Sequence, residues 1–318
     1  MKIVILDGFA ENPGDLSWDG IRAFGDVTVY DRTPKDAILT RAAGAEILVT
    51  NKTPLTKETL AHLPDVKFIA LLSTGYNIVD CAYAKQRGIP VSNIPAYSTE
   101  SVAQLVFALI LEHTRQVGLH SRSVAAGDWA KSADFCYTLA PLTDLTGKTL
   151  GIIGYGSIGK AVARIALALG MRVKATSRTH TAGGDGGVTF CDLDTLIATG
   201  DIVSLHCPLT PETTGLVNRD FLRKMKPAAL LINTSRGPVV DEQALADALN
   251  RGEIAGAGLD VMAQEPPQAD NPLFTAKNCF ITPHIAWAAY ETRQRLMDVF
   301  TANIAAYIHG TPINVVNP

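Results

Sequence analysis

The stretch that decides the fold is TLGIIGYGSIGKAVARIALALG, residues 149–170. An apolar run ends at Gly154, and Gly156 and Gly159 complete a G-x-G-x-x-G spacing that opens an amphipathic helix. Gly154 permits a tight turn, Gly156 lets the backbone approach a pyrophosphate, and Gly159 lets helix and strand pack closely. The N-terminus of such a helix offers free N–H groups and a positive dipole end to phosphate. The stretch therefore predicts a dinucleotide-binding turn, which its flanks favour over a glycine-rich turn without a ligand.

Apolar runs alternate with helical patterns on both sides of this turn. The runs are KIVIL, VTVY, EILVT, KFIALL and IPVSNI before residue 100, and TLGIIG, RVKAT, DIVSLH, ALLINT, GAGLDV and CFIT after residue 148. This rhythm predicts an α/β protein with two doubly wound parallel sheets, the second with the six strands of a Rossmann domain. A long helix is expected to begin at Ser98, and a last helix is expected over about 288–309. Residues 181–187 are expected to form a loop. Six strands leave little room for that last helix in the second domain, so we place it on the first. We therefore expect one domain at 100–286 and a discontinuous domain formed by 1–99 and 287–318.

Composition narrows the class of protein. The chain has 318 residues, a formal net charge of -3, and five cysteines. The charge is too small to indicate a nucleic-acid or membrane partner. None of the cysteines forms a C-x-x-C pair, and no apolar run approaches the roughly 18 residues of a membrane span. We therefore expect a cytoplasmic protein without a metal site.

The second strand of the later series ends at Ser177 and Arg178, where dinucleotide-binding chains usually carry an Asp or Glu. An acid there binds the ribose hydroxyls and repels a 2′-phosphate. Ser177 removes the repulsion, Arg178 can pair with phosphate, and Thr179 can add a donor. The pattern predicts that NADP(H) is preferred and NAD(H) possible. The alternative is that Arg178 is a solvated loop residue and the two cofactors are used alike.

Three polar residues follow the ends of three later strands: Arg236, Glu265 and His284. Open α/β sheets bind ligands at that edge. Arg236 can grip a carboxylate with two bonds, and His284 can exchange a proton with a carbonyl or alcohol oxygen. Glu265 can accept a bond from the other imidazole nitrogen and favour the protonated ring. Taken singly, each could be a loop cap, a solvated acid or a core histidine; together they predict an acid–base site.

At these residues the chain resembles the D-isomer-specific 2-hydroxyacid dehydrogenases. The matching stretches are GYGSIG, LHCPLTPETTGLVN, LINTSRGPVVDEQAL, GAGLDVMAQEPP and ITPHIAW. LLSTGYNIVD, at 71–80, is most similar to the glycerate dehydrogenases, also called hydroxypyruvate or glyoxylate reductases. The resemblance implies a flavodoxin-like substrate-binding domain at 1–99 with 287–318, an NAD(P)-binding Rossmann domain at 100–286, and a homodimer built around the helix from Ser98.

The resemblance also implies roles for individual residues. It implies that Arg236, Glu265 and His284 are the catalytic residues and that Asp260 binds the carboxamide of the cofactor. The expected cofactor-binding residues are Gly154, Tyr155, Gly156, Ser157, Ile158, Gly159, Ser177, Arg178, Thr179, Cys207, Pro208, Thr213, Thr234, Ser235, Arg236, Asp260 and His284. The expected substrate-binding residues are Ser73, Thr74 and Gly75 through their backbone, with Arg236, His284 and Trp287.

The expected activity is NAD(P)H-dependent reduction of a short 2-oxoacid, with His284 as the general acid. Trp287 either narrows the substrate pocket or is a core aromatic. A 3-phosphoglycerate dehydrogenase would need cationic groups beside LLSTGYN, where no basic cluster stands. A nucleotide-sensing, corepressor-like scaffold on the same fold is the non-enzymatic alternative, and the full set of Arg236, Glu265 and His284 argues against it.

Overall fold

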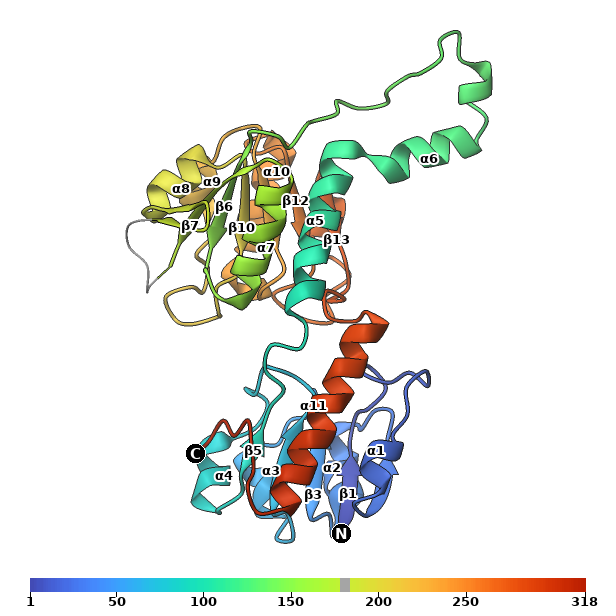
Figure 1. Ribbon diagram of the computed structural model, residues 1–318, viewed down its shortest axis with the longest axis vertical. Coiled ribbons are helices and arrows are strands. Elements are labelled where there is room, and N and C mark those ends of the chain that lie inside the picture. Colours follow the sequence, from blue (N-terminus) through green and yellow to red (C-terminus); the bar gives the residue numbers. More distant parts are fainter. Residues whose placement is uncertain (178–183) are drawn as a thin grey trace. The chain divides into compact units, whose positions relative to one another are not determined.

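The computed structural model describes residues 1–177 and 184–318. The chain forms two compact units, which we call unit 1 (residues 1–97 and 288–318) and unit 2 (residues 98–287). Each unit is a largely parallel sheet packed against helices (Figure 1). The α/β fold class with two doubly wound sheets is thus confirmed.

Unit 1 holds a five-stranded parallel sheet in the order β2-β1-β3-β4-β5. This is the flavodoxin-like order 2-1-3-4-5. The strands are β1 (Lys2–Ile5), β2 (Asp26–Val29), β3 (Ile47–Thr50), β4 (Phe68–Leu71) and β5 (Val91–Ser92). The helices are α1 (Asp19–Arg22), α2 (Ile38–Ala42), α3 (Lys57–Ala61), α4 (Cys81–Gln86) and α11 (Tyr290–Ile308), with a 3-10 turn at Lys35–Ala37.

The last helix, α11, belongs to unit 1 because its apolar residues complete that core. Tyr307 of α11 stacks on Phe68 of β4 with ring centroids 4.3 Å apart. Phe300 is fully buried and meets the ring of Trp18 edge to face. Arg293 holds the β1–α1 loop, since its guanidinium donates two bonds to Asp15, at 2.7 and 2.6 Å. The C-terminal segment is therefore part of the first sheet's packing.

Unit 2 holds an eight-stranded sheet in the order β13-β12-β11-β10-β6-β7-β9-β8. The strands are β6 (Thr149–Ile153), β7 (Arg172–Thr176), β8 (Gly184–Asp185), β9 (Val188–Phe190), β10 (Ile202–Leu205), β11 (Leu230–Asn233), β12 (Gly256–Leu259) and β13 (Cys279–Ile281). The helices are α5 (Thr99–Arg115), α6 (Val117–Ala125), α7 (Ser157–Ala168), α8 (Leu193–Thr199), α9 (Arg219–Lys224) and α10 (Glu242–Arg251), with 3-10 turns at Trp129–Lys131, Gly237–Val239 and Pro272–Thr275.

The prediction of six strands in this unit is wrong, because β8 and β9 are added. Residues 184–185 form β8, antiparallel to β9, inside the stretch predicted to be a loop. β9 is only three residues long, with buried, exposed and buried positions, so it shows no apolar run. With β9 included, the order β9-β7-β6-β10-β11-β12 is the Rossmann order 3-2-1-4-5-6, and β13 extends it.

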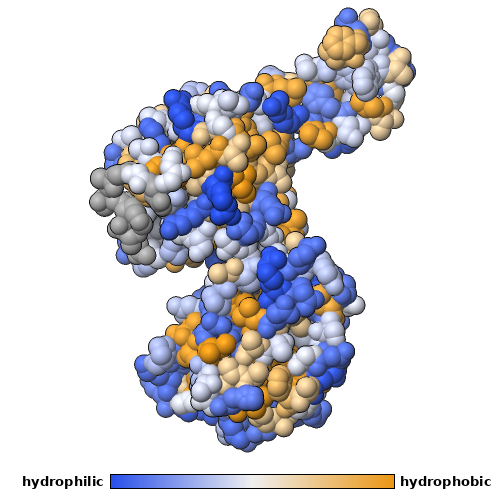
Figure 2. All heavy atoms as spheres, in the orientation of Figure 1, coloured by the Kyte–Doolittle hydropathy of each residue, from blue (hydrophilic) through white to orange (hydrophobic). Residues whose placement is uncertain are grey.

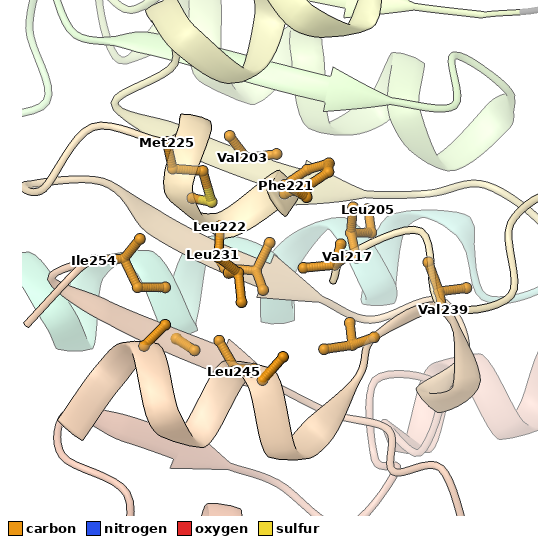
Figure 3. Packing of buried hydrophobic residues seen from close by; sticks show 14 of the residues in the cluster. Val203, Leu205, Val217, Phe221, Leu222, Met225, Leu231, Val239, Leu245 and Ile254 are labelled. Atoms are coloured by element: carbon orange, nitrogen blue, oxygen red, sulfur yellow. The ribbon is translucent and has the colours of Figure 1, made fainter. Parts of the chain in front are cut away.

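The core of unit 2 holds the carboxyl ends of its strands in place. Figure 3 shows the part between α9, α10 and the strands β10 and β11, where Val203, Leu205, Phe221, Leu231 and Leu245 interlock. Leu205, Leu231 and Leu245 are fully buried. Truncating such a leucine to alanine typically costs about 2–5 kcal/mol. The loops that follow β10, β11 and β12 thus start from rigid points.

An arm, residues 116–142, extends from the end of α5 (Figure 1). Gln116 turns the chain with a left-handed φ of 52°, and α6 follows. The base of the arm is closed by Thr143, whose N–H donates to the Thr114 carbonyl at 2.9 Å. Figure 2 shows apolar residues on its surface, and Phe135 is 88% exposed. The arm therefore has its own helix, α6, and exposed apolar side chains.

Glu11 is a buried acid in the β1–α1 loop of unit 1. It is 0% exposed and accepts a bond from the Asn51 amide. Within residues 1–177 and 184–318, Glu11 Oε2 and Asn51 Oδ1 are both buried without a hydrogen-bond partner. Burial, with Asp7 nearby, raises the pKa of Glu11 to about 8, against the smaller opposing charge of Lys52. A protonated carboxyl supplies the donor that the two acceptors lack.

Because of Glu11, we expect the free energy of unfolding to fall as the pH rises. The folded-state pKa of Glu11 lies above the ordinary value of 4.5, so the folded chain holds the proton more tightly than the unfolded chain between pH 4.5 and about 8. Its contribution to the free energy of unfolding is fully present below that window and is lost toward pH 8, with a slope of up to about 1.4 kcal/mol per pH unit. Glu11→Gln removes this dependence. Urea midpoints of both proteins from pH 5 to 9 test it, and parallel curves would contradict the assignment.

Candidate active site

The glycine turn after β6 is dictated by close backbone contacts. Gly154 has φ +98°, and a Cβ there would lie 2.6 Å from the backbone of His206 and Cys207. A Cβ at Gly159 would lie 2.3 Å from the Gly154 carbonyl oxygen. At Gly156, by contrast, a Cβ would meet no atom of the described residues within 4 Å. The first and third glycines are therefore needed for packing, and the second leaves open space at the start of α7.

The remaining residues of the turn divide between packing and exposure. The Tyr155 ring packs edge-on against Phe190 at 5.2 Å, so its side chain belongs to the core. Ile158 is partly buried against the same cluster, while Ser157 is exposed. The Gly154 N–H donates to the Thr176 carbonyl at 3.0 Å, which sets Ser177, at the end of β7, beside the turn. Arg178 and Thr179, predicted to contact a 2′-phosphate, lie outside the described residues.

Two loops at the same sheet edge contain the other predicted cofactor residues. After β10, Cys207 is buried, and the Thr213 hydroxyl donates to the Pro208 carbonyl at 2.7 Å. After β11, the Ser235 hydroxyl donates to Asn233 at 2.8 Å. Thr213 and Ser235 thus use their hydroxyls to shape their own loops.

The site fits a dinucleotide on two observations. The Thr234 hydroxyl oxygen is buried and, within the described part of the chain, has no hydrogen-bond partner. A buried polar atom of this kind needs a partner, and a ribose or amide group can provide one. The open space at Gly156 faces the N-terminus of α7, a helix of 12 residues whose dipole favours phosphate.

His284 and Glu265 form a bonded pair. The imidazole Nδ1 lies 2.7 Å from Glu265 Oε2, with the side chains 31% and 36% exposed. Glu265 Oε1 accepts the Met262 N–H at 3.0 Å. With the carboxylate as acceptor, Nδ1 carries the hydrogen and Nε2 is left for a reacting group. This is the geometry of a general acid–base with an orienting partner.

Asp260 anchors the segment that carries His284. His284 has a left-handed φ of 55°. The Asp260 carboxylate accepts the N–H groups of Ile285 and Ala286, at 2.8 and 2.9 Å, and the Thr282 hydroxyl at 2.6 Å. Burial raises the pKa of Asp260, and these bonds oppose that shift. Its predicted role toward the cofactor carboxamide stays a prediction beside this structural one. Thr282 is absent from the predicted site residues; its only signal is a hydroxyl two residues before the histidine.

Arg236 is exposed at the start of the loop that follows β11. One N–H donates to the Ser235 carbonyl at 2.7 Å. Next to it, a Cβ at Gly237 would fall 1.9 Å from the backbone of Met262, so the Arg236 and Glu265 loops pack directly together. Arg236, Glu265 and His284 follow β11, β12 and β13, which are adjacent in the sheet. Exposure suits a group that is to grip a ligand.

The remaining predicted residues are Ser73–Gly75 and Trp287. Ser73–Gly75 follow β4 in unit 1, and there the Ser73 hydroxyl donates to the Gly75 carbonyl and the Thr74 hydroxyl to Ile94, both at 2.7 Å. Trp287 is partly buried at the end of unit 2. Across residues 1–177 and 184–318, no three His, Cys, Asp or Glu side chains are grouped to hold a metal ion. None of the helices in these residues has both the length and the hydropathy of a membrane-spanning segment.

A Rossmann sheet with a glycine turn on its first strand and a paired imidazole at the same edge defines a dinucleotide-dependent dehydrogenase. Residues 107–286 match the family model for the D-isomer specific 2-hydroxyacid dehydrogenase, NAD binding domain. The chain is 48% identical to a hydroxypyruvate reductase of Blautia hydrogenotrophica over 100% of both chains. It is 46% identical to a glycerate dehydrogenase of Methylorubrum extorquens over 89% of each.

A solved structure agrees. An NADPH-dependent glyoxylate/hydroxypyruvate reductase from Sinorhizobium meliloti, in complex with NADP and malonate, matches with a TM-score of 0.84 and 29% identity, over 99% of this chain and 96% of that one. The chain belongs to the D-isomer specific 2-hydroxyacid dehydrogenase family. The resemblance drawn from its motifs is confirmed.

The His284–Glu265 pair makes a kinetic prediction. His284→Ala should lower kcat for reduction by about 10²–10⁴, the usual effect of losing a positioned general acid. Glu265→Gln should be milder and should move the alkaline limb of the pH–rate profile to lower pH, because the protonated ring loses its anionic partner. Steady-state rates from pH 5.5 to 9.5 measure both. An unmoved limb in Glu265→Gln would disconnect the two residues.

Proposed function

We propose that the protein is an NAD(P)H-dependent reductase of short 2-oxoacids, acting on hydroxypyruvate and glyoxylate, and on D-glycerate in reverse. The observation that carries the proposal is the 2.7 Å bond between His284 and Glu265 at the edge of the nucleotide-type sheet. The names of the relatives support the substrate class, since they include hydroxypyruvate reductase, glycerate dehydrogenase and glyoxylate reductase.

In this proposal each residue has one task. His284 gives the proton on Nε2 to the carbonyl oxygen as it becomes an alcohol, and Glu265 stabilises the ring while it is charged. The exposed Arg236 guanidinium, with donors beyond the one used by Ser235, holds the substrate carboxylate. For the backbone N–H groups of Ser73–Gly75, which follow β4, we propose binding of a substrate carboxylate, as the family resemblance implies. The reduced nicotinamide, when bound, supplies the hydrogen and electron pair for C2.

We further propose that NADPH is preferred over NADH. Ser177, in place of an acid, directly follows β7 beside the glycine turn, which fits a site that tolerates a 2′-phosphate. Arg178 follows it in sequence and can add a charge-assisted contact. Two solved relatives are described with NADPH or NADP, an acyclic imino acid reductase and the Sinorhizobium meliloti enzyme.

The cofactor proposal is tested by kcat/KM for NADPH and NADH with glyoxylate, hydroxypyruvate and phenylpyruvate. Arg178→Ala should weaken NADPH use by about tenfold, with NADH nearly unchanged, and the loss should shrink as salt is raised. Ser177→Asp should swing the preference toward NADH, because the acid repels the phosphate and binds the ribose. A wild-type enzyme tenfold better with NADH would overturn the preference, and no turnover of any oxoacid would overturn the proposed activity.

The arm leads us to propose a homodimer. Its exposed apolar side chains include Val117, Trp129, Phe135 and Leu139, at 64%, 53%, 88% and 48% exposure. Apolar groups gathered in this way mark an interaction surface, and a self-complementary contact between two copies is the commonest one.

Phe135→Asp with Leu139→Asp should therefore yield monomers in sedimentation velocity. Leu169→Asp is the matched control, since Leu169 is also exposed, at 39%, but lies outside the arm. The control should leave the wild-type dimer intact. A monomeric wild-type protein, or a doubly substituted protein that still dimerises, would refute the proposal.

A further inference from the structure

Glu242, in the first turn of α10, binds both ends of the loop that carries Glu265. Its Oε1 accepts the Ala263 N–H at 2.6 Å, and its Oε2 accepts the Asn271 side-chain amide at 2.7 Å. Asn271 in turn caps the 3-10 turn at Pro272–Thr275 through a bond from the Leu273 N–H. One carboxylate thus closes the loop from residue 263 to residue 271.

The contacts continue from this carboxylate to the imidazole. Ala263 and Met262 are neighbours in the chain, and their N–H groups go to two different acids, Glu242 and Glu265. Glu265 then holds His284 at 2.7 Å. A carboxylate that fixes Ala263 therefore also fixes the peptide that orients Glu265.

The ordinary reason for an acid in a first helical turn does not explain Glu242. Acids there favour the helix dipole and can cap free N–H groups. In α10 the cap is Asp241, whose side chain accepts the Ala244 N–H at 3.0 Å. The Glu242 carboxylate instead bonds the loop, at Ala263 and at Asn271. Close packing of Gly237 on Met262 brings the two segments together, so the loop is within reach of α10.

We propose that Glu242 is a positioning residue for the Glu265–His284 pair. It holds the loop so that Glu265 can present one oxygen to the Met262 N–H and the other to the imidazole. This inference rests on the proposed function, because the pair's proton transfer is what Glu242 serves. Glu242 acts through Glu265 and His284 and need touch neither substrate nor cofactor.

The test is Glu242→Gln, which keeps the length of the side chain but turns one acceptor into a donor. One of its two bonds is then lost. We expect kcat to fall by about tenfold, the scale seen when an outer partner of a functional group is removed. The alkaline limb of the pH–rate profile should move toward lower pH, as in Glu265→Gln but less, while the Kd of the cofactor, followed by fluorescence, stays unchanged.

Asp241→Asn is the matched control, because it removes the same charge one residue away and asparagine caps a helix as well as aspartate does. It should leave kcat and the profile as in the wild type. Asn271→Ser is a second, gentler variant, since serine keeps the cap but lacks the amide that Glu242 binds. The alkaline limb of its pH–rate profile should also move toward lower pH, by less than in Glu242→Gln.

A double-variant cycle separates positioning from general stability. In a Glu265→Gln background, Glu242→Gln should move the limb no further, because the residue it acts through is already changed. A drop in kcat with an unmoved limb in both Glu242→Gln and Asn271→Ser would overturn the inference and leave a structural role. If Glu265→Gln itself leaves the limb unmoved, the proposed role of the pair fails first, and the role of Glu242 fails with it.

Discussion

Parallel pairing of β6 with its neighbours is the constraint on which the functional part of unit 2 depends. Because the strands β10, β11, β12 and β13 run in the same direction as β6, the loops after them all leave from one edge. Residues far apart in sequence, such as Gly154 and His284, therefore belong to one set of loops. The sheet does not choose the chemistry; it only guarantees that side chains placed after strands can cooperate.

At two positions, a glycine allows the backbones of two loops to pack in direct contact. A Cβ at Gly154 would clash with the backbone that follows β10, and a Cβ at Gly237 would clash with the backbone of Met262. Each contact joins two loops that follow different strands. A methyl group at either position would force backbone apart, so these glycines are fixed by neighbours, whereas Gly156 faces open space among the described residues. The difference separates packing glycines from one that leaves room for a ligand.

The sequence predicts what is local and periodic. The glycine turn and the apolar runs of eleven strands follow from spacing alone, but β9, with its three residues, carries too little pattern. Of the site, Arg236, Glu265 and His284 are visible because polar residues at strand ends are unexpected. The bonds of Asp260 to Thr282 and of Glu242 to Asn271 are not visible, since they join positions 22 and 29 residues apart whose spacing follows no secondary-structure period. The exposure of Arg236 likewise depends on neighbours that only the fold supplies.

The histidine shows why such bonds gather at the site. His284 stands in the left-handed region, where a side chain with a Cβ is disfavoured by about 1–2 kcal/mol. Glycine would relieve that strain but would remove the imidazole. The chain keeps the histidine and offsets the strain with three bonds to Asp260, two of them from the N–H groups of Ile285 and Ala286 that directly follow it. The buried Asp260 carboxylate, bonded by two backbone N–H groups and one hydroxyl, holds the ring's position, and the partly exposed Glu265 bonds the ring's Nδ1. The unfavourable backbone conformation thus occurs at the residue whose side chain transfers the proton in the proposed reaction. The bonds to the neighbouring carboxylates stabilise that conformation.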